Sequence, residues 1–151
     1  MKLGSKGRYA VMAMVDLAFH GTGRPVSLAE IALRQDISLS YLEQLFARLR
    51  RHGLVESVRG PGGGYLLARS ACDICIVEVV DAVDESLRVT RCPRGALPTR
   101  GCMSDHSRCL THDLWADLGD HMRAFLGSVT LDDVCCRNRA GVSRSRAMAA
   151  E

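Results

Sequence analysis

Metal-binding side chains are concentrated in one short stretch of the 151-residue chain. Residues 91–112, RCPRGALPTRGCMSDHSRCLTH, hold three cysteines and two histidines. Thiolate sulfur and imidazole nitrogen bind zinc and iron–sulfur clusters, and neighbouring arginines favour the thiolate over the thiol. This donor set therefore predicts a metal centre. The spacing C-x9-C-x6-C-x2-H gives four candidate ligands, which are Cys92, Cys102, Cys109 and His112.

The same stretch has too few apolar side chains to fold against a core. Its large aliphatic residues are Leu97, Met103 and Leu110, whose spacing fits neither a helix nor a strand. We therefore expect a bound inorganic centre to order it. The donors alone leave tetrahedral zinc and an iron–sulfur cluster as alternatives, and unligated thiols are the less favoured interpretation. His106 is a further nitrogen donor, which we interpret as a bystander.

The other four cysteines have plainer interpretations. Cys72 and Cys75 form a C-x2-C pair at the start of an expected helix, where small buried cysteines are common. Cys135 and Cys136 are adjacent, and nothing in the sequence requires a role for them. A small thiol redox enzyme is a rival hypothesis, but no cofactor fingerprint and no base beside a nucleophile accompany the thiols. We therefore expect no enzymatic activity.

Hydropathy and the N-terminal sequence indicate a cytoplasmic protein. The segment MKLGSKGRYA lacks the apolar core of a signal peptide, and no apolar run approaches the roughly 20 residues of a membrane span. Cytoplasmic thiols stay reduced, which favours ligands over disulfides for the seven cysteines. We expect no membrane partner.

A mainly α fold with a small β-hairpin is predicted, and residues 1–70 form its first domain. The segment SKGRYAVMAMVDLAFHG has the apolar spacing of a helix, and a capping box at Ser27 and Glu30 opens a second, short helix. After a third helix, the β-prone runs LVESV and GYLLA flank a glycine-rich tip. Three helices followed by a hairpin predict a winged helix-turn-helix that binds DNA.

The third helix, SLSYLEQLFARLRRHG, has one apolar and one polar face. Its inward positions follow helical spacing and are Leu42, Leu45, Phe46 and Leu49. Ser40 and Glu43 form a second capping box, with Ser38 as an alternative cap, and the helix is expected to run to about His52. Polar residues crowd its first turn, the end that a recognition helix inserts into the major groove. Glutamine can pair with adenine there, and glutamate can accept a hydrogen bond from cytosine.

The hairpin tip and the charge distribution favour the same partner. Three consecutive glycines, Gly62 to Gly64, lose much entropy on folding, which favours a tip that approaches another surface closely. Arg59 would then reach a minor groove. Residues 1–69 hold ten Lys/Arg and five Asp/Glu, whereas residues 70–136 hold six and eleven. A basic N-terminal half predicts a polyanion partner.

Residues 71–134 are predicted to form dimerisation helices around the cysteine-rich loop at 91–112. Asp73 is expected to cap a helix whose apolar stripe is Ile76, Val79, Val80 and Val83. A long C-terminal helix, from about Leu110 to Val129, carries a second stripe at Leu114, Leu118, Met122, Phe125, Leu126 and Val129. Because residues 1–70 can build their own core, this stripe predicts a homodimer and hence a palindromic promoter site on double-stranded DNA. The polar residues 135–151 predict a disordered tail.

Four segments, SKGRYAV, SLSYLEQLFARLR, VRGPGGGYLLA and VDAVDES, resemble the IscR-type regulators of iron–sulfur cluster assembly, which are winged-helix transcription factors. The resemblance covers about residues 1–134. It implies a repressor or activator that senses iron–sulfur cluster status and controls cluster-assembly genes. It also implies DNA contacts at Ser38, Ser40, Tyr41, Glu43, Gln44, Arg59, Gly60 and Pro61. Glu43 is the acidic position that the family links to the choice between two classes of DNA site.

The same resemblance implies a [2Fe–2S] cluster on Cys92, Cys102, Cys109 and His112. This sequence departs from the family pattern in a longer spacer between the first and third cysteines. One imidazole ligand is neutral and titratable, so such a cluster is expected to be held less firmly than by four thiolates. A zinc-structured DNA-binding regulator without sensing remains an alternative hypothesis.

Overall fold

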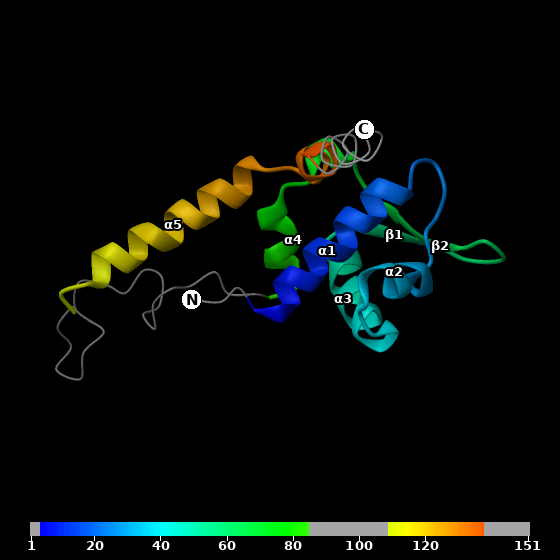
Figure 1. Ribbon diagram of the computed structural model, residues 1–151, viewed down its shortest axis with the longest axis horizontal. Helices are drawn as coiled ribbons and strands as arrows, with labels where there is room; N and C mark the ends of the chain where they lie inside the picture. Colours follow the sequence, from blue (N-terminus) through cyan, green and yellow to red (C-terminus); the bar gives the residue numbers. More distant parts are fainter. Residues whose placement is uncertain (1–3, 85–108, 138–151) are drawn as a thin grey trace, which may run out of the picture.

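The computed structural model describes residues 4–84 and 109–137. Within these ranges the chain is mainly helical, and one two-stranded antiparallel sheet follows the third helix (Figure 1). This order confirms the predicted winged helix-turn-helix with a long C-terminal helix. No helix in the described part of the chain is long and apolar enough to cross a membrane.

The first two helices begin and end where the sequence predicts. The first helix, α1 (Ser5–His20), has Gly21 as its C-cap. The second, α2 (Leu28–Gln35), opens with the predicted capping box. The Glu30 N–H donates to Ser27 Oγ at 3.3 Å, and the Ser27 N–H donates to Glu30 Oε2 at 2.9 Å. Two orphan amides of the helix end are thereby satisfied.

The third helix, α3 (Leu39–Arg51), is capped by Ser38 rather than by Ser40. The Tyr41 N–H donates to Ser38 Oγ at 3.3 Å, whereas Ser40 lies inside the first turn. The predicted capping box of Ser40 and Glu43 is therefore wrong, and the alternative cap is correct. The helix ends one residue before His52, as expected.

The hairpin consists of β1 (Val55–Val58) and β2 (Gly64–Leu67), which pair in antiparallel register. A short bridge also joins β2 to the residue before α2. The Val26 N–H donates to the Tyr65 carbonyl at 3.0 Å, and the Tyr65 N–H donates to the Val26 carbonyl at 2.8 Å. These two hydrogen bonds fix β2 against the segment that leads into α2.

The fourth helix, α4 (Ile76–Ala82), follows the 3₁₀ turn η1 (Ala71–Asp73). Its N-cap is Cys75 and not Asp73, which lies within η1. Glu78, the third residue of the helix, reaches back to accept a hydrogen bond from the Cys75 N–H at 2.9 Å. The predicted inward stripe of α4, Ile76, Val79, Val80 and Val83, is buried.

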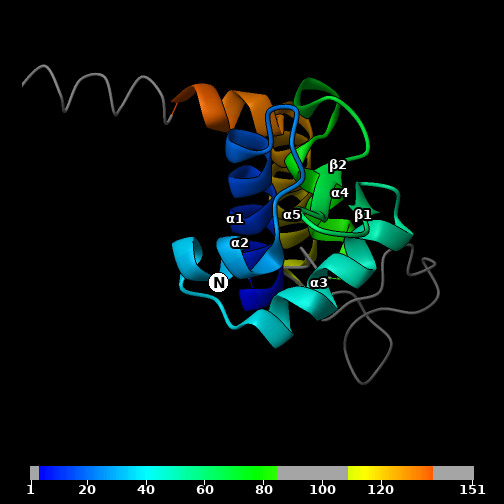
Figure 2. The ribbon, with the colours of Figure 1, turned by 90° about the vertical axis from the view of Figure 1, so that its right-hand side faces the viewer.

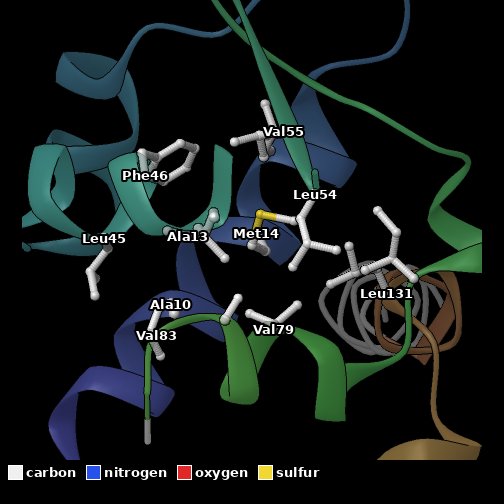
Figure 3. Packing of buried hydrophobic residues seen from close by; sticks show 14 of the residues in the cluster. Ala10, Ala13, Met14, Leu45, Phe46, Leu54, Val55, Val79, Val83 and Leu131 are labelled. Carbon is white, nitrogen blue, oxygen red and sulfur yellow. The ribbon is translucent and has the colours of Figure 1, made fainter. Parts of the chain in front are cut away.

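The hydrophobic core extends past residue 70. Figure 3 shows Val79 and Val83 facing the α1 residues Ala10 and Met14, with Leu131 beside them, and all five side chains are buried. The core therefore includes α4 and the beginning of a helical segment at residues 131–137. Figures 1 and 2 place α2 and α3 on one side of α1 and this segment on the other.

The last long helix, α5 (His112–Ser128), packs on α4 and extends away from the rest of the molecule (Figure 1). None of its side chains is buried. A capping interaction of Thr130 with Asp133 then opens the segment 131–137, as predicted. Residues 135–137 of the expected tail are helical, and its remainder lies outside the described residues.

Candidate functional site

The first turns of α3 present a polar, exposed surface. Ser40, Glu43 and Gln44 are exposed there and form what we call the α3 reading face. No side-chain hydrogen bond or ion pair within residues 4–84 and 109–137 engages these three side chains. They are therefore available to an external partner.

Two other candidate contacts, Ser38 and Tyr41, also serve the fold. The Ser38 hydroxyl caps α3. The Tyr41 ring is half-buried and meets the Tyr9 ring of α1 edge-on, with 5.9 Å between the ring centroids. Edge-to-face packing of this kind fixes the orientation of a ring. These residues hold the start of α3 in place beside the reading face.

The tip of the hairpin carries the remaining candidates, Arg59, Gly60 and Pro61, all of them exposed. Figure 1 shows this tip projecting from the body on the side opposite to the free end of α5. Gly60 and Gly62 have φ angles of 104° and 72°, which side-chain-bearing residues rarely adopt. The backbone of the tip therefore requires these two glycines, and it presents the Arg59 guanidinium to solvent.

The next two glycines have an internal reason that the sequence did not reveal. A Cβ at Gly63 would lie 2.4 Å from the Val58 carbonyl oxygen, and a Cβ at Gly64 would lie 2.4 Å from the Val26 carbonyl oxygen. Both contacts are shorter than van der Waals packing allows. The glycine run therefore serves the close approach of backbone segments within the chain, and it is not in itself a sign of a DNA surface.

A buried ionic network holds α2 against α1, and sequence reasoning missed it. Asp16 is 4% exposed and accepts hydrogen bonds from Arg34 Nη2 at 2.6 Å and from Gln35 Nε2 at 2.7 Å. Arg34 Nε lies 3.1 Å from both carboxylate oxygens. The signal was an aspartate inside the apolar run VMAMVDLAF, because a carboxylate is rarely buried without a partner.

Two of the four candidate metal ligands lie in the described part of the chain and adjoin one another. Cys109 directly precedes the last turn before α5, and His112 is the first residue of that helix. The His112 N–H donates to the Cys109 carbonyl at 3.1 Å, and both residues are half-buried. A Cys-x2-His pair on one turn can offer sulfur and nitrogen to the same ion.

Cys92, Cys102 and the bystander His106 fall outside the described residues. Within the described ranges, no group of three metal-binding side chains is present.

The remaining cysteines are separate from this pair. Cys72 is exposed in η1, and Cys75 is the half-buried N-cap of α4. Cys135 is buried, with its Sγ 3.8 Å from the Val15 carbonyl oxygen, and Cys136 Sγ lies 3.6 Å from an Asp132 carboxylate oxygen.

Apolar side chains on α5 lie in solvent. Leu114 is 61% exposed and Phe125 is 60% exposed, and Trp115 and Leu110 are exposed beside them. By contrast, Leu118, Met122 and Leu126 of the predicted stripe are half-buried. Large exposed apolar side chains along one helix are typical of an association surface.

Comparison with known proteins agrees with this geometry. Residues 3–137 match a family model described as Rrf2, iron-dependent transcriptional regulator. The chain is 58% identical over 134 residues to the HTH-type transcriptional regulator IscR of Xenorhabdus nematophila, which covers 89% of this chain and 79% of that protein. A putative HTH-type transcriptional regulator, ORF2 of Azotobacter vinelandii, is 57% identical and covers 91% of this chain and 81% of its own length.

Solved structures give the same result. The structure of T. potens IscR superposes with a TM-score of 0.73 at 37% identity, and the match covers 91% of this chain and 88% of that one. CymR, the global cysteine regulator of B. subtilis, has the same TM-score at 30% identity and covers 91% of this chain and 98% of its own. These relatives are transcriptional regulators and not enzymes, as the sequence predicted. The chain therefore belongs to the Rrf2 family and is an IscR-type transcriptional regulator.

Proposed function

We propose that this regulator binds a palindromic promoter site as a homodimer and senses iron–sulfur cluster supply through a [2Fe–2S] cluster, thereby controlling cluster-assembly genes. The observation that carries the proposal is the position of a Cys-x2-His pair at the start of the exposed helix α5, in a chain with a solvent-facing α3 reading face. The first feature suits a sensor and the second suits a DNA reader.

Sequence reading is assigned to the α3 reading face. Gln44 can pair with adenine by donating from its amide nitrogen and accepting at its amide oxygen, and Glu43 can accept a hydrogen bond from the cytosine amino group. Ser38, Ser40 and Tyr41 carry hydroxyls that can bond phosphate. Glu43 is repelled by phosphates wherever no base donates a hydrogen bond to its carboxylate, which makes it a determinant of site choice.

The tip of the hairpin, Arg59 to Gly63, which we call the wing, is assigned to the minor groove. Arg59 supplies the positive charge, and the exposed backbone of Gly60 and Pro61 brings it close to the DNA. A contact of this type reads groove width and phosphate charge rather than base identity.

The cluster is assigned to Cys92, Cys102, Cys109 and His112. Three thiolates and one imidazole fit an iron–sulfur centre in donor chemistry, and the two ligands in the described ranges lie on one turn. When bound, the cluster supplies a redox-active and labile centre.

Anisotropy titrations with fluorescent palindromic duplex test the DNA contacts. Gln44→Ala is expected to cost about 1–3 kcal/mol on the specific site and little on random DNA. Arg59→Ala is expected to weaken binding to both and to lower the salt slope by about one. The control Arg137→Ala removes an exposed arginine at the end of the helical segment 131–137, outside the helix-turn-helix and the hairpin. If Arg59→Ala and Arg137→Ala behave alike, the wing assignment is wrong.

Anaerobic purification followed by visible spectroscopy and assays of iron and acid-labile sulfide tests the cluster. Cys109→Ala is expected to lose the iron and the colour. The exposed Cys72, altered in the same way, is expected to leave both unchanged. A colourless wild-type protein with stoichiometric zinc would refute the cluster and support the zinc-structured alternative.

Sedimentation analysis tests the dimer. Phe125→Glu places a charge on the exposed apolar surface of α5 and is expected to yield monomer. Leu33→Glu is the matched control, because Leu33 is an exposed leucine on α2. Wild-type protein that sediments as a monomer at micromolar concentration would refute the dimer.

A further inference from the structure

Three carboxylates spaced three residues apart line α4 and its C-terminal end. Glu78 and Asp81 lie in the helix, and Asp84 follows its C-cap. We call these three residues the carboxylate row. Each forms an ion pair with an arginine from a different part of the chain.

One member of the row pairs with an arginine that follows the hairpin, and one pairs with an arginine of α5. Arg69, two residues after β2, places Nη2 2.7 Å from Glu78 Oε1. Arg123 of α5 places Nη1 2.9 Å from Asp81 Oδ1 and bonds the second oxygen through Nη2. The paired arrangement of two nitrogens on two oxygens fixes orientation as well as distance.

The third member faces the recognition helix. Arg48 of α3 bonds the Asp84 carboxylate through Nη1, and the same nitrogen lies 3.5 Å from the Val83 carbonyl oxygen. Asp84 has a φ of 54°, so the chain turns sharply at this contact. The α3 side chain therefore holds the C-terminal end of α4.

These pairs are better suited to orienting helices than to stabilising the fold. Asp84 is 74% exposed and Arg48 is 37% exposed, and exposed pairs contribute little to stability. The buried contacts of Val79 and Val80 already hold α4 in the core. An ion pair at the edge of this buried contact sets the angle between α4 and the neighbouring element.

We propose that the carboxylate row is the positioning device that links α5 to the DNA-reading elements. The ion pair of Asp81 with Arg123 fixes the position of α4 relative to α5. The ion pairs of Asp84 and Glu78 fix α4 relative to α3 and to the end of the hairpin. The sensing part rests on the proposed function, because His112, a proposed ligand, begins α5. The positioning part concerns DNA binding alone and needs no cluster.

A double-mutant cycle on cluster-free, full-length protein tests the positioning part. Arg48→Gln, Asp84→Asn and the double variant are titrated with the same palindromic duplex. Each single change is expected to weaken binding about two- to five-fold, and the double variant no further than Arg48→Gln alone. Arg48→Lys keeps the charge and a donor nitrogen and is expected to restore binding. Strictly additive effects would overturn the positioning role.

The control for charge is Asp36→Asn. Asp36 is exposed and has a φ of 53°, so both substitutions replace an exposed aspartate in the same backbone conformation by asparagine, which tolerates it. Asp36→Asn is expected to change the DNA affinity of cluster-loaded and cluster-free protein by the same factor.

The ratio of DNA affinities between cluster-loaded and cluster-free protein tests the coupling. Asp84→Asn and Asp81→Asn are expected to reduce this ratio about two- to five-fold while iron content and spectrum stay unchanged. Asp81→Asn is expected to leave the affinity of the cluster-free form unaltered, because its partner lies on α5. A wild-type ratio in both variants would overturn the coupling. Equal affinities of the two wild-type forms would instead refute the sensing function, and the cycle would still decide the positioning role.

Discussion

Replacing Asp16 by asparagine is expected to destabilise the protein strongly, although the change preserves shape. The Asp16 side chain is 1% exposed, and four donor contacts converge on its two oxygens at 2.6–3.1 Å. Asparagine keeps one acceptor oxygen and turns the other into a donor. That donor would face Arg34 Nε or Gln35 Nε2, which are themselves donors.

The size of the loss follows from two opposing effects. Breaking one side of a buried ion pair typically costs about 3–5 kcal/mol. Here the Arg34 side chain remains 29% exposed, so water can satisfy part of it once the carboxylate is gone. We therefore expect the free energy of unfolding to fall by about 2–4 kcal/mol.

Urea titration followed by circular dichroism measures this loss. Wild-type protein and variant must be compared at one protein concentration, because dimer stability depends on concentration. The exposed Asp36, replaced by asparagine in the same way, is expected to change stability by less than about 0.5 kcal/mol. A loss below about 1 kcal/mol for Asp16→Asn, with an unchanged m-value, would show that the network does not hold α2 on α1.

Three further changes test other parts of the fold. Gly64→Ala places a Cβ 2.4 Å from the Val26 carbonyl oxygen and must open the bridge between Val26 and β2. We expect the free energy of unfolding to fall by about 2–3 kcal/mol and the Tm measured by calorimetry to fall with it. An unchanged Tm would contradict the clash. Ser27→Ala removes the cap of α2 and is expected to cost about 1 kcal/mol in urea, whereas a neutral result would mean that water replaces the hydroxyl. The hydrogen bond from Arg69 holds the pKa of Glu78 below its ordinary value of 4.5. The stabilising effect of this hydrogen bond is therefore complete above pH 4.5 and is lost as the pH falls through the lower pKa of the folded state. Glu78→Gln should flatten the acid side of the plot of unfolding free energy against pH. A plot as steep as that of wild type would refute this.

The sequence predicts the helices, but for α3 and α4 it favours the caps Ser40 and Asp73. The caps in the structure are Ser38 and Cys75. The correct cap Ser38 is preceded by Ile37 and followed four residues later by Leu42, and both are buried. The rejected cap Ser40 would have paired the exposed Leu39 with the exposed Gln44. A buried pair at these two positions is the hydrophobic staple of a helix N-terminus.

The same rule separates the two candidate caps of α4. Around Cys75, the staple positions are Ile74 and Val79, and both are completely buried. Around Asp73 they would be Cys72 and Val77, of which the first is exposed. A polar residue type therefore identifies a cap less reliably than the apolar residues that flank it.

The candidate site was predictable in part. Exposure of the α3 reading face follows from the helical spacing of its apolar residues, and it agrees with the structure. The Asp16 network was not predictable in its partners, because Arg34 and Gln35 lie 18 and 19 residues away along the chain. A tertiary contact of this kind depends on how α1 and α2 cross, which local periodicity does not specify.

The glycines at positions 62–64 show how a residue type can point to DNA binding for a reason that is only partly right. Three consecutive glycines predict close approach to DNA, yet Gly63 and Gly64 are each required by a neighbouring backbone of the same chain. The glycines do allow a close approach of the backbone, but the surface approached is another backbone segment of the same chain. The case for a DNA-facing wing therefore rests on Arg59, whose side chain is exposed at a tip whose turn requires the positive φ angles of Gly60 and Gly62. Substitutions at Gly63 or Gly64 are therefore expected to impair DNA binding through folding, whereas Arg59→Ala is the substitution in the hairpin tip that is expected to lower DNA affinity without lowering stability.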